Sequence, residues 1–164
     1  MISKKVQAAL NAHLNKELYS EYLYLAMAAY FDSTRFQGFA NWMRAQAEEE
    51  REHALKFWTY IDDREGRVVL DSIAKPPTDY KGPLDAFQQA YDHEREVTKA
   101  IHELYAQARA ENDYATEVFL NWFIAEQVEE EKMTSQIVEK LRELGDSKAS
   151  LLILDRELGS RSEG

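Results

Sequence analysis

The sequence predicts an all-α fold: an antiparallel four-helix bundle with one long crossover between its second and third helices, plus a short fifth helix. Two observations predict it. Apolar residues recur at helical spacing through four segments, each on the order of 28 residues long. All three prolines fall in the single long stretch that lacks this period. We expect residues 1–164 to form one domain, with the bundle spanning about residues 3–144.

The first two helices are expected to form a hairpin. The first runs from Ser3, a residue type that caps helices, to about Phe31. The segment DSTR breaks the pattern, and the second helix follows from about Phe36 to Arg64. Because this link is so short, the two helices should pack antiparallel.

The second half of the chain begins with a long connection, GRVVLDSIAKPPTDYKGP at 66–83, which has no helical period. The third helix is expected at about Leu84–Ala110. A short turn leads to the fourth at about Ala115–Leu144, and Gly145 is placed to end it. The segment DSKASLLILDREL, 146–158, predicts a short fifth helix. The long connection allows the third helix to run parallel to the second.

Composition excludes several classes of function. The net charge is −10, from 30 acidic and 20 basic residues, so a phosphate backbone would be repelled and we expect no nucleic-acid partner. No apolar run approaches the roughly 20 residues that span a bilayer, so no membrane association is expected. The absence of cysteine excludes thiolate metal sites and disulfides, and a cytoplasmic location is the default expectation.

Each long helix carries a carboxylate among the residues expected to face the core. Steps of seven residues follow one inward stripe of a packed helix. In the second helix this stripe reads Phe36, Met43, Glu50 and Phe57, and the neighbouring stripe brings His53 beside the glutamate. The other three helices show the same substitution near the middle of their length, at Glu17, Glu94 and Glu130. In an antiparallel bundle these positions meet at one level.

Four buried carboxylates would be strongly destabilising alone, since each unpaired buried ion costs several kcal/mol. Protonation, buried Lys or Arg partners, or bound cations would relieve this cost. Lys and Arg fall mostly on the outer faces, so bound metal is the better explanation, and four carboxylates balance two divalent ions. Oxygen ligands with one imidazole favour iron or manganese, although zinc also fits such a site.

Other polar residues near these stripes allow two interpretations. Three glutamates lie one position aside and are as well explained by a solvated face: Glu49, Glu126 and Glu129. Tyr24 follows Glu17 by seven residues and is either a core tyrosine or a redox-active neighbour. The remaining histidines lack matching partners and are assigned to structural or surface positions: His13, His93 and His102.

Three segments together resemble the bacterial and archaeal non-haem ferritins: LNKELYSEYLYL at 14–25, FANWMRAQAEEEREHALKF at 39–57 and FLNWFIAEQVEEE at 119–131. The resemblance implies a hollow homo-oligomeric shell, commonly of 24 subunits. It also implies ferroxidase activity: Fe(II) is oxidised within each subunit, with O2 or H2O2 as the electron acceptor. The Fe(III) mineral is then stored inside the shell.

The resemblance also implies a set of ligands. One iron would be held by Glu17, Glu50 and His53. The second would be held by Glu50, Glu94 and Glu130, with Gln127 nearby. A third iron site would use the glutamates that match this branch of the family: Glu49, Glu126, Glu129 and Glu130. Tyr24 matches the tyrosine beside the diiron centre.

Two departures of this sequence from related families indicate which branch of the ferritins it resembles. Bacterioferritins carry a haem-ligating methionine immediately after the glutamate of the first Glu-x-x-His motif, and here that position is Arg51, so no haem is expected. The second Glu-x-x-His of the general diiron bundle is replaced by Gln127-Val-Glu-Glu130. Both departures favour the non-haem branch.

Two other functions are compatible with the same sequence observations. A diiron oxidase acting on an organic substrate would need the same ligands and a substrate pocket. A metal-free helical scaffold would instead assemble through the segment SLLILDREL, 150–158.

Overall fold

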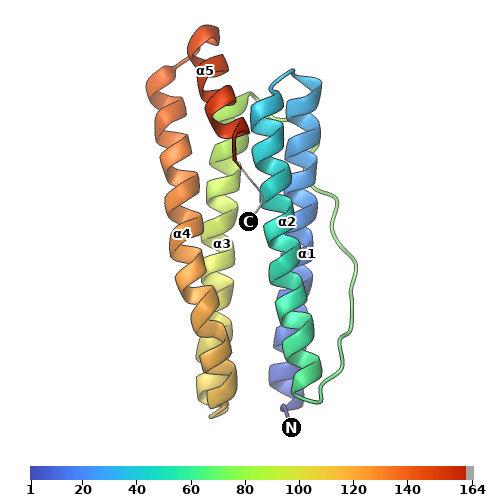
Figure 1. Ribbon diagram of the computed structural model, residues 1–164. Coiled ribbons are helices and arrows are strands. Elements are labelled where there is room, and N and C mark those ends of the chain that lie inside the picture. The colour runs from blue at the N-terminus through green and yellow to red at the C-terminus, as the bar shows by residue number, and fades with distance from the viewer. Residues whose placement is uncertain (162–164) are drawn as a thin grey trace.

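The computed structural model describes residues 1–161, and the last three residues of the chain, 162–164, lie outside the described part. Across that part the regular structure is helical, with no strand. The helices are α1 (Lys4–Ser33), α2 (Gln37–Asp63), α3 (Pro83–Ala110), α4 (Tyr114–Leu144) and α5 (Lys148–Gly159). The predicted all-α architecture of four long helices and a short fifth one is confirmed (Figure 1).

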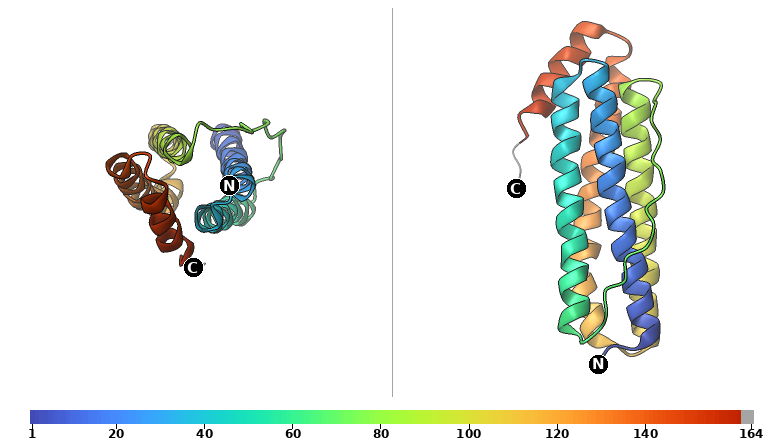
Figure 2. Two further views of the ribbon diagram at one scale, coloured as in Figure 1. Left: turned by 90° about the horizontal axis from the view of Figure 1, so that it is seen from above. Right: turned by 90° about the vertical axis from the view of Figure 1, so that its right-hand side faces the viewer.

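The topology follows from the lengths of the links. α1 and α2 form one antiparallel pair, α3 and α4 form another, and the crossover returns along the bundle so that α3 runs parallel to α2 (Figures 1 and 2). Asparagines of α1 fix the crossover. The Asn11 side chain donates to the Arg67 carbonyl oxygen and accepts from the Val69 amide, both at 2.8 Å. Asn15 donates to the Ser72 carbonyl oxygen at 3.0 Å.

Helix ends follow local capping chemistry and differ from the predicted ends by one or two residues. The Ser3 hydroxyl accepts from the Val6 amide at 3.1 Å and caps α1 as predicted. α1 continues into the DSTR segment and ends at Ser33, before Arg35 adopts a positive φ of 68°. α3 begins with Pro83, a favoured first helical residue because its missing N–H has no partner there. Gly145 ends α4 with φ of 60°.

The apolar core is divided into two clusters along the bundle. One cluster gathers aromatic side chains from α1, α2 and α3, including Phe31, Phe39 and Phe87. The other lies toward the opposite end and includes Leu10 and Phe57. Between them on the inward stripes lie buried polar side chains, the four predicted glutamates among them. The middle of the bundle is therefore a buried polar layer between two apolar clusters.

α5 crosses one end of the bundle and packs mainly on α2 (Figures 1 and 2). Two glycines make this close approach. A Cβ on Gly159 would lie 2.7 Å from the Gly38 Cα, and one on Gly38 would lie 1.7 Å from the Asp155 carbonyl oxygen. The Asp155 carboxylate accepts from the Phe39 amide at 2.8 Å and so binds one of the free N–H groups at the start of α2.

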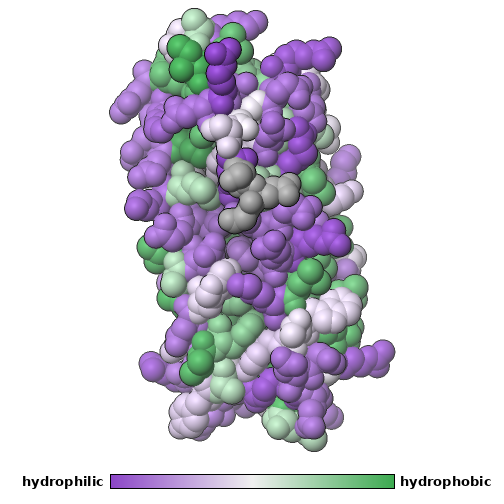
Figure 3. Space-filling view, in the orientation of Figure 1, coloured by the Kyte–Doolittle hydropathy of each residue, from purple (hydrophilic) through white to green (hydrophobic). Residues whose placement is uncertain are grey.

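The surface is mostly hydrophilic on the face shown in Figure 3, with smaller hydrophobic areas toward both ends. Within residues 1–161, no helix combines the length and the apolar character needed to cross a bilayer. Leu154 of α5 is buried, whereas Leu152 and Ile153 are exposed.

The contact between α5 and α2 gives a stability prediction. Gly38→Ala should destabilise the protein by about 1–3 kcal/mol, because the new methyl group meets backbone atoms and α5 must move. Helix propensity alone predicts the opposite sign, a gain of about 1 kcal/mol. The midpoint of thermal unfolding measures the result, with Gln37→Ala, an exposed neighbour, as the control. A Gly38→Ala protein as stable as the control would contradict the packing argument.

Candidate metal centre

The middle layer brings together two groups of ligand atoms that share one residue. Glu17, Glu50 and His53 each place a ligand atom within 4.8 Å of the others. Glu50, Glu94 and Glu130 do the same. All five residues are buried, and they come from the four long helices. The sequence expectation that the mid-helix carboxylates face inward at one level is met by this geometry.

The half of the centre on α1 and α2 contains the imidazoles. Glu50 Oε2 lies 3.2 Å from His53 Nδ1. Glu17 Oε1 lies 2.8 Å from His13 Nε2, one helical turn earlier. The other oxygen, Glu17 Oε2, is buried without a hydrogen-bond partner and lies 3.7 Å from His53 Nδ1, which is too long for a hydrogen bond. This orphaned oxygen is free to bind a cation.

In the half of the centre on α3 and α4, the carboxylates of Glu94 and Glu130 accept hydrogen bonds from neutral donors. The Tyr24 hydroxyl donates to Glu94 Oε1 at 2.6 Å, and Gln127 Nε2 donates to Glu94 Oε2 at 3.1 Å. Gln46 Nε2 donates to Glu130 Oε2 at 2.6 Å and to Glu50 Oε1 at 3.2 Å. Every donor here is an amide or a phenol, so this half carries no positive charge of its own.

Burial and mutual repulsion shift the acidity of these groups. Burial and the charges of neighbouring glutamates raise the pKa of Glu50 well above its ordinary value and raise the pKa of Glu130 to about 9. Burial also raises the pKa of Glu94, although Tyr24 and Gln127 partly oppose the shift. Burial alone would raise the pKa of Glu17, but the hydrogen bond from His13 and the nearby imidazole of His53 reverse the direction and lower it.

The imidazole of His53 is also perturbed. Burial lowers its pKa, but Glu17 and the more distant charges of Glu126 and Glu94 together outweigh burial and leave the pKa raised. Across residues 1–161, no Lys or Arg side chain forms an ion pair with Glu17, Glu50, Glu94 or Glu130. The expected lack of buried cationic partners therefore holds in the described structure. Protons or bound cations must neutralise the centre.

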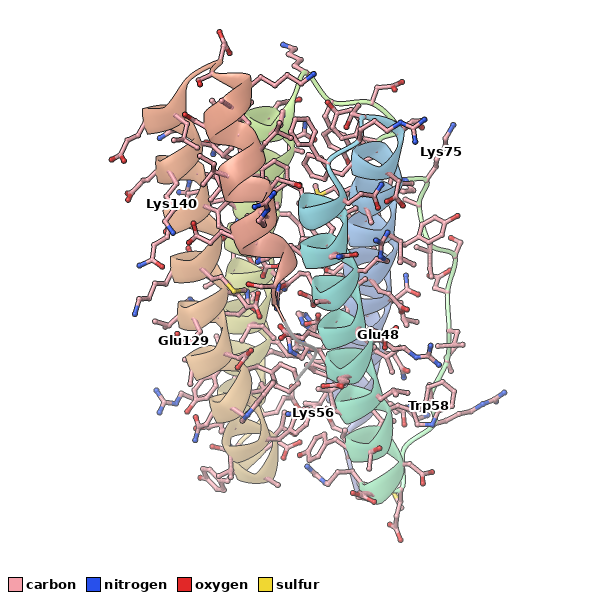
Figure 4. The ribbon with its side chains drawn as sticks, turned by 45° about the horizontal axis from the view of Figure 1, so that its top comes forward. Glu48, Lys56, Trp58, Lys75, Glu129 and Lys140 are labelled. Carbon is pink, nitrogen blue, oxygen red and sulfur yellow. The ribbon has the colours of Figure 1, made fainter. Side chains whose placement is uncertain are left out.

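The glutamates expected at a third iron site differ in burial and in the residues that they contact. Glu126 has a ligand atom within 4.8 Å of ligand atoms of His53 and Glu130. Glu49 is half-buried and pairs with Arg161 at 2.9 Å. Glu129 is exposed on α4 (Figure 4). A third site built from all of these glutamates stays a prediction.

The structure corrects the assignment of His13, which has a partner in Glu17 and is buried in the site. The spacing of four residues between them was the signal, since such pairs share a helix face. His102 is exposed and His93 bonds to the Ser20 hydroxyl at 2.7 Å, in keeping with surface and structural positions. Gln46 lies on the inward stripe of the second helix, but the stripe does not show that its amide joins two ligands.

Comparison with known proteins gives one consistent result. A family model described as a ferritin-like domain matches residues 7–144. The bacterial non-heme ferritin of Staphylococcus epidermidis is 41% identical over 162 residues, covering 99% of this chain and 98% of the relative. The same protein of Staphylococcus aureus is 40% identical over the same share of both chains.

Solved structures agree with this result over the whole chain. An Archaeoglobus fulgidus ferritin, engineered into a closed form by site-directed mutagenesis, matches with a TM-score of 0.99 and 51% identity, and each chain is fully covered. The open-pore ferritin of the same archaeon matches with a TM-score of 0.98 and 51% identity, over 99% of this chain and all of the other. The chain therefore belongs to the ferritin family and resembles its bacterial and archaeal non-haem members.

Proposed function

We propose that this protein is an iron-storage ferritin that oxidises Fe(II) to Fe(III) at a diiron centre inside each subunit. The observation that carries the proposal is the pair of ligand groups that share Glu50. One residue common to two groups is what two adjacent ions need, since its carboxylate can bridge them. The first ion is assigned to Glu17, Glu50 and His53, and the second to Glu50, Glu94 and Glu130, with Gln127 beside it.

The ligand set suits the reaction. Anionic oxygen ligands stabilise Fe(III) more than Fe(II), so they favour loss of an electron from each ion. Two adjacent Fe(II) ions together supply the two electrons that, with two protons, reduce O2 to H2O2. The same two electrons and two protons reduce H2O2 to two molecules of water. Either oxidant therefore balances, and O2 or H2O2 is proposed as the acceptor.

Tyr24 is proposed to support this electron transfer. Its hydroxyl donates to Glu94, a ligand of the second ion, at 2.6 Å. Burial and the surrounding carboxylates raise the pKa of Tyr24 well above its ordinary value, so the phenol keeps its proton at neutral pH. An electron that leaves the ring can be accompanied by transfer of this proton to Glu94.

Storage requires an assembly, and a homo-oligomeric shell of 24 subunits is proposed. Whole-length similarity to ferritins of known structure supports a shell. The net charge of −10 favours accumulation of cations near such a protein. Haem is not part of the proposal, because the exposed Arg51 occupies the position at which bacterioferritins carry their haem-ligating methionine. The cytoplasmic location expected from the sequence is retained.

An oxidase acting on an organic substrate receives less support. A groove lies on the face of α2 and α4 beside His53, lined by Leu55, Tyr60 and Phe119 among others. However, the rings of Trp122 and Phe123 stand between this groove and the ligands, with centroids 5.4 and 5.9 Å from that of His53. The groove is therefore a surface feature and does not open onto the ligand oxygens.

Removal of ligands should abolish rapid iron oxidation. Glu50→Ala and His53→Ala should each slow oxidation roughly tenfold or more, because even residues that only orient metal ligands have effects on this scale. Apoprotein is mixed with Fe(II) without oxygen, O2 is admitted, and formation of Fe(III) is followed by absorbance. Glu52→Ala, an exposed residue of the same helix, is the control. Oxidation at the wild-type rate in both ligand variants would refute the assignment.

Metal binding should release protons. At pH 7 Glu130, with a pKa of about 9, holds a proton in the metal-free protein, and an ion can bind only after that proton leaves. Zn(II) affinity should therefore rise as the pH rises from 6 to 8, by up to about tenfold per unit for each displaced proton. His53 contributes in the same direction, because its raised pKa also keeps a proton that ligation displaces.

Titration calorimetry of Zn(II) over that pH range measures the effect, and Glu130→Gln separates the two contributions. Gln carries no displaceable proton, so the slope of affinity against pH should fall by about one proton per chain in this variant. An affinity independent of pH in the wild-type protein would show that the carboxylates are already ionised.

His13 should act through Glu17. Its hydrogen bond holds Glu17 Oε1 and leaves Oε2 free for the metal. His13→Leu removes the donor and should weaken Co(II) binding roughly tenfold, the scale for groups that orient a ligand. His13→Gln keeps an N–H donor and should restore most of the affinity. Co(II) absorption in metal-free shells gives both values, and equal affinities in the two variants would exclude a positioning role.

A further inference from the structure

Arg161, two residues after α5, contacts α2 beside the metal centre. Its Nη2 lies 2.9 Å from Glu49 Oε1, and its Nη1 donates to Gln46 Oε1 at 3.0 Å. The same Nη1 lies 3.5 Å from the Trp42 carbonyl oxygen, and the guanidinium stands over the Trp42 ring at 4.7 Å from its centroid. The Arg161 side chain is only 16% exposed. Such a contact is far more enclosed than an ordinary surface ion pair.

The position of Arg161 is set by the packing of α5. Gly159, two residues earlier, lies against Gly38 at the start of α2. The guanidinium is thereby delivered to Trp42, Gln46 and Glu49, three residues on one side of α2.

Arg161 also determines which end of the Gln46 amide faces the metal centre. The amide oxygen accepts from Arg161, and the amide nitrogen donates to Glu130 and Glu50. An amide has one oxygen and one NH2 group, so a donor on one side leaves only the NH2 group for the other. Arg161 and the two buried carboxylates are therefore joined through a single side chain.

A divalent ion and the guanidinium compete for Glu49. An ion bound to this carboxylate would lie about 2.0–2.2 Å from its oxygen. Arg161 Nη2 is already 2.9 Å from Glu49 Oε1, so two like charges would stand within a few ångströms in a largely buried place. Their repulsion there is only weakly screened by solvent. Occupancy of a site that includes Glu49 therefore favours departure of Arg161.

We infer that Arg161 determines how many ions the centre holds, by occupying the Glu49 position of the third site until a divalent cation displaces it. The inference rests on the proposed function and on the predicted third site, since it requires ions at the first two positions and a further ion at Glu49. The first two positions fill first, because Arg161 contacts none of their ligands. A third ion must remove the guanidinium from Glu49 and from Trp42, so it binds more weakly.

Metal titration of the assembled apoprotein tests this inference. Shells are titrated with Co(II) without oxygen, and bound metal per chain is measured after gel filtration. The wild-type protein should bind two ions tightly and a third weakly. Arg161→Gln should strengthen binding of the third ion roughly tenfold, because a charge-assisted competitor for Glu49 is gone. Arg156→Gln, an exposed position of α5 with the same loss of charge, should leave all three affinities unchanged.

Two further measurements distinguish displacement of Arg161 from Glu49 from a general effect of losing one positive charge. The double variant Arg161→Gln with Glu49→Gln should lose the gain, because the gain arises from the freed carboxylate. In the wild-type protein, binding of the third Zn(II) ion should be accompanied by its own change in tryptophan fluorescence, and Trp42→Phe should remove that step while leaving any earlier change from Trp122 beside His53. Zn(II) is used because it does not quench fluorescence through redox chemistry.

The outcomes distinguish the two claims. The wild-type protein and Arg161→Gln could both bind two ions tightly, with no gain in affinity for the third ion in the variant. That result would overturn the role of Arg161 and leave the diiron centre intact. Failure of the wild-type protein to bind even two ions would overturn the proposed function, and the inference with it. A gain of the same size in Arg156→Gln would also overturn the inference, since net charge alone would then explain it.

Discussion

The constraint on which this structure depends is the burial of four carboxylates in the middle of a helical bundle without a Lys or Arg partner among the described residues. A buried, unpaired carboxylate is too costly to remain charged, so the metal-free centre keeps protons, most clearly on Glu130. The two apolar clusters on either side supply the packing that tolerates this layer. Bound cations remove the conflict, because they replace protons with charge that all the carboxylates share.

The helices and the inward carboxylates could be predicted because both depend on local periodicity. A step of seven residues follows one helix face, so the spacing alone predicts that Glu17, Glu50, Glu94 and Glu130 point inward, as they do in the structure. Glycine, proline and cap residues placed the helix ends to within one or two residues. These signals lie within each helix and need no knowledge of its neighbours.

The partners of the ligands could not be predicted in the same way. Two of the three hydrogen bonds of the Gln46 amide reach Glu130, 84 residues away, and Arg161, 115 residues away. Such contacts depend on how α4 and α5 dock, which no local period records. The runs of glutamate show the same limit. In residues 48–50 the first is exposed, the second half-buried and the third buried, and only the phase of the packed helix separates them.

The two halves of the centre differ in a way that bears on the path of iron. On α1 and α2, His13 holds one oxygen of Glu17 and leaves the other free near His53, so the proposed first position combines a nitrogen ligand with carboxylates. On α3 and α4, Glu94 and Glu130 already accept strong hydrogen bonds from Tyr24 and Gln46, and no nitrogen ligand belongs to that group of three. An ion at the second position must compete with those donors. Under the proposed assignment, we expect that ion to be held less tightly than the first and to be better placed to leave for the mineral.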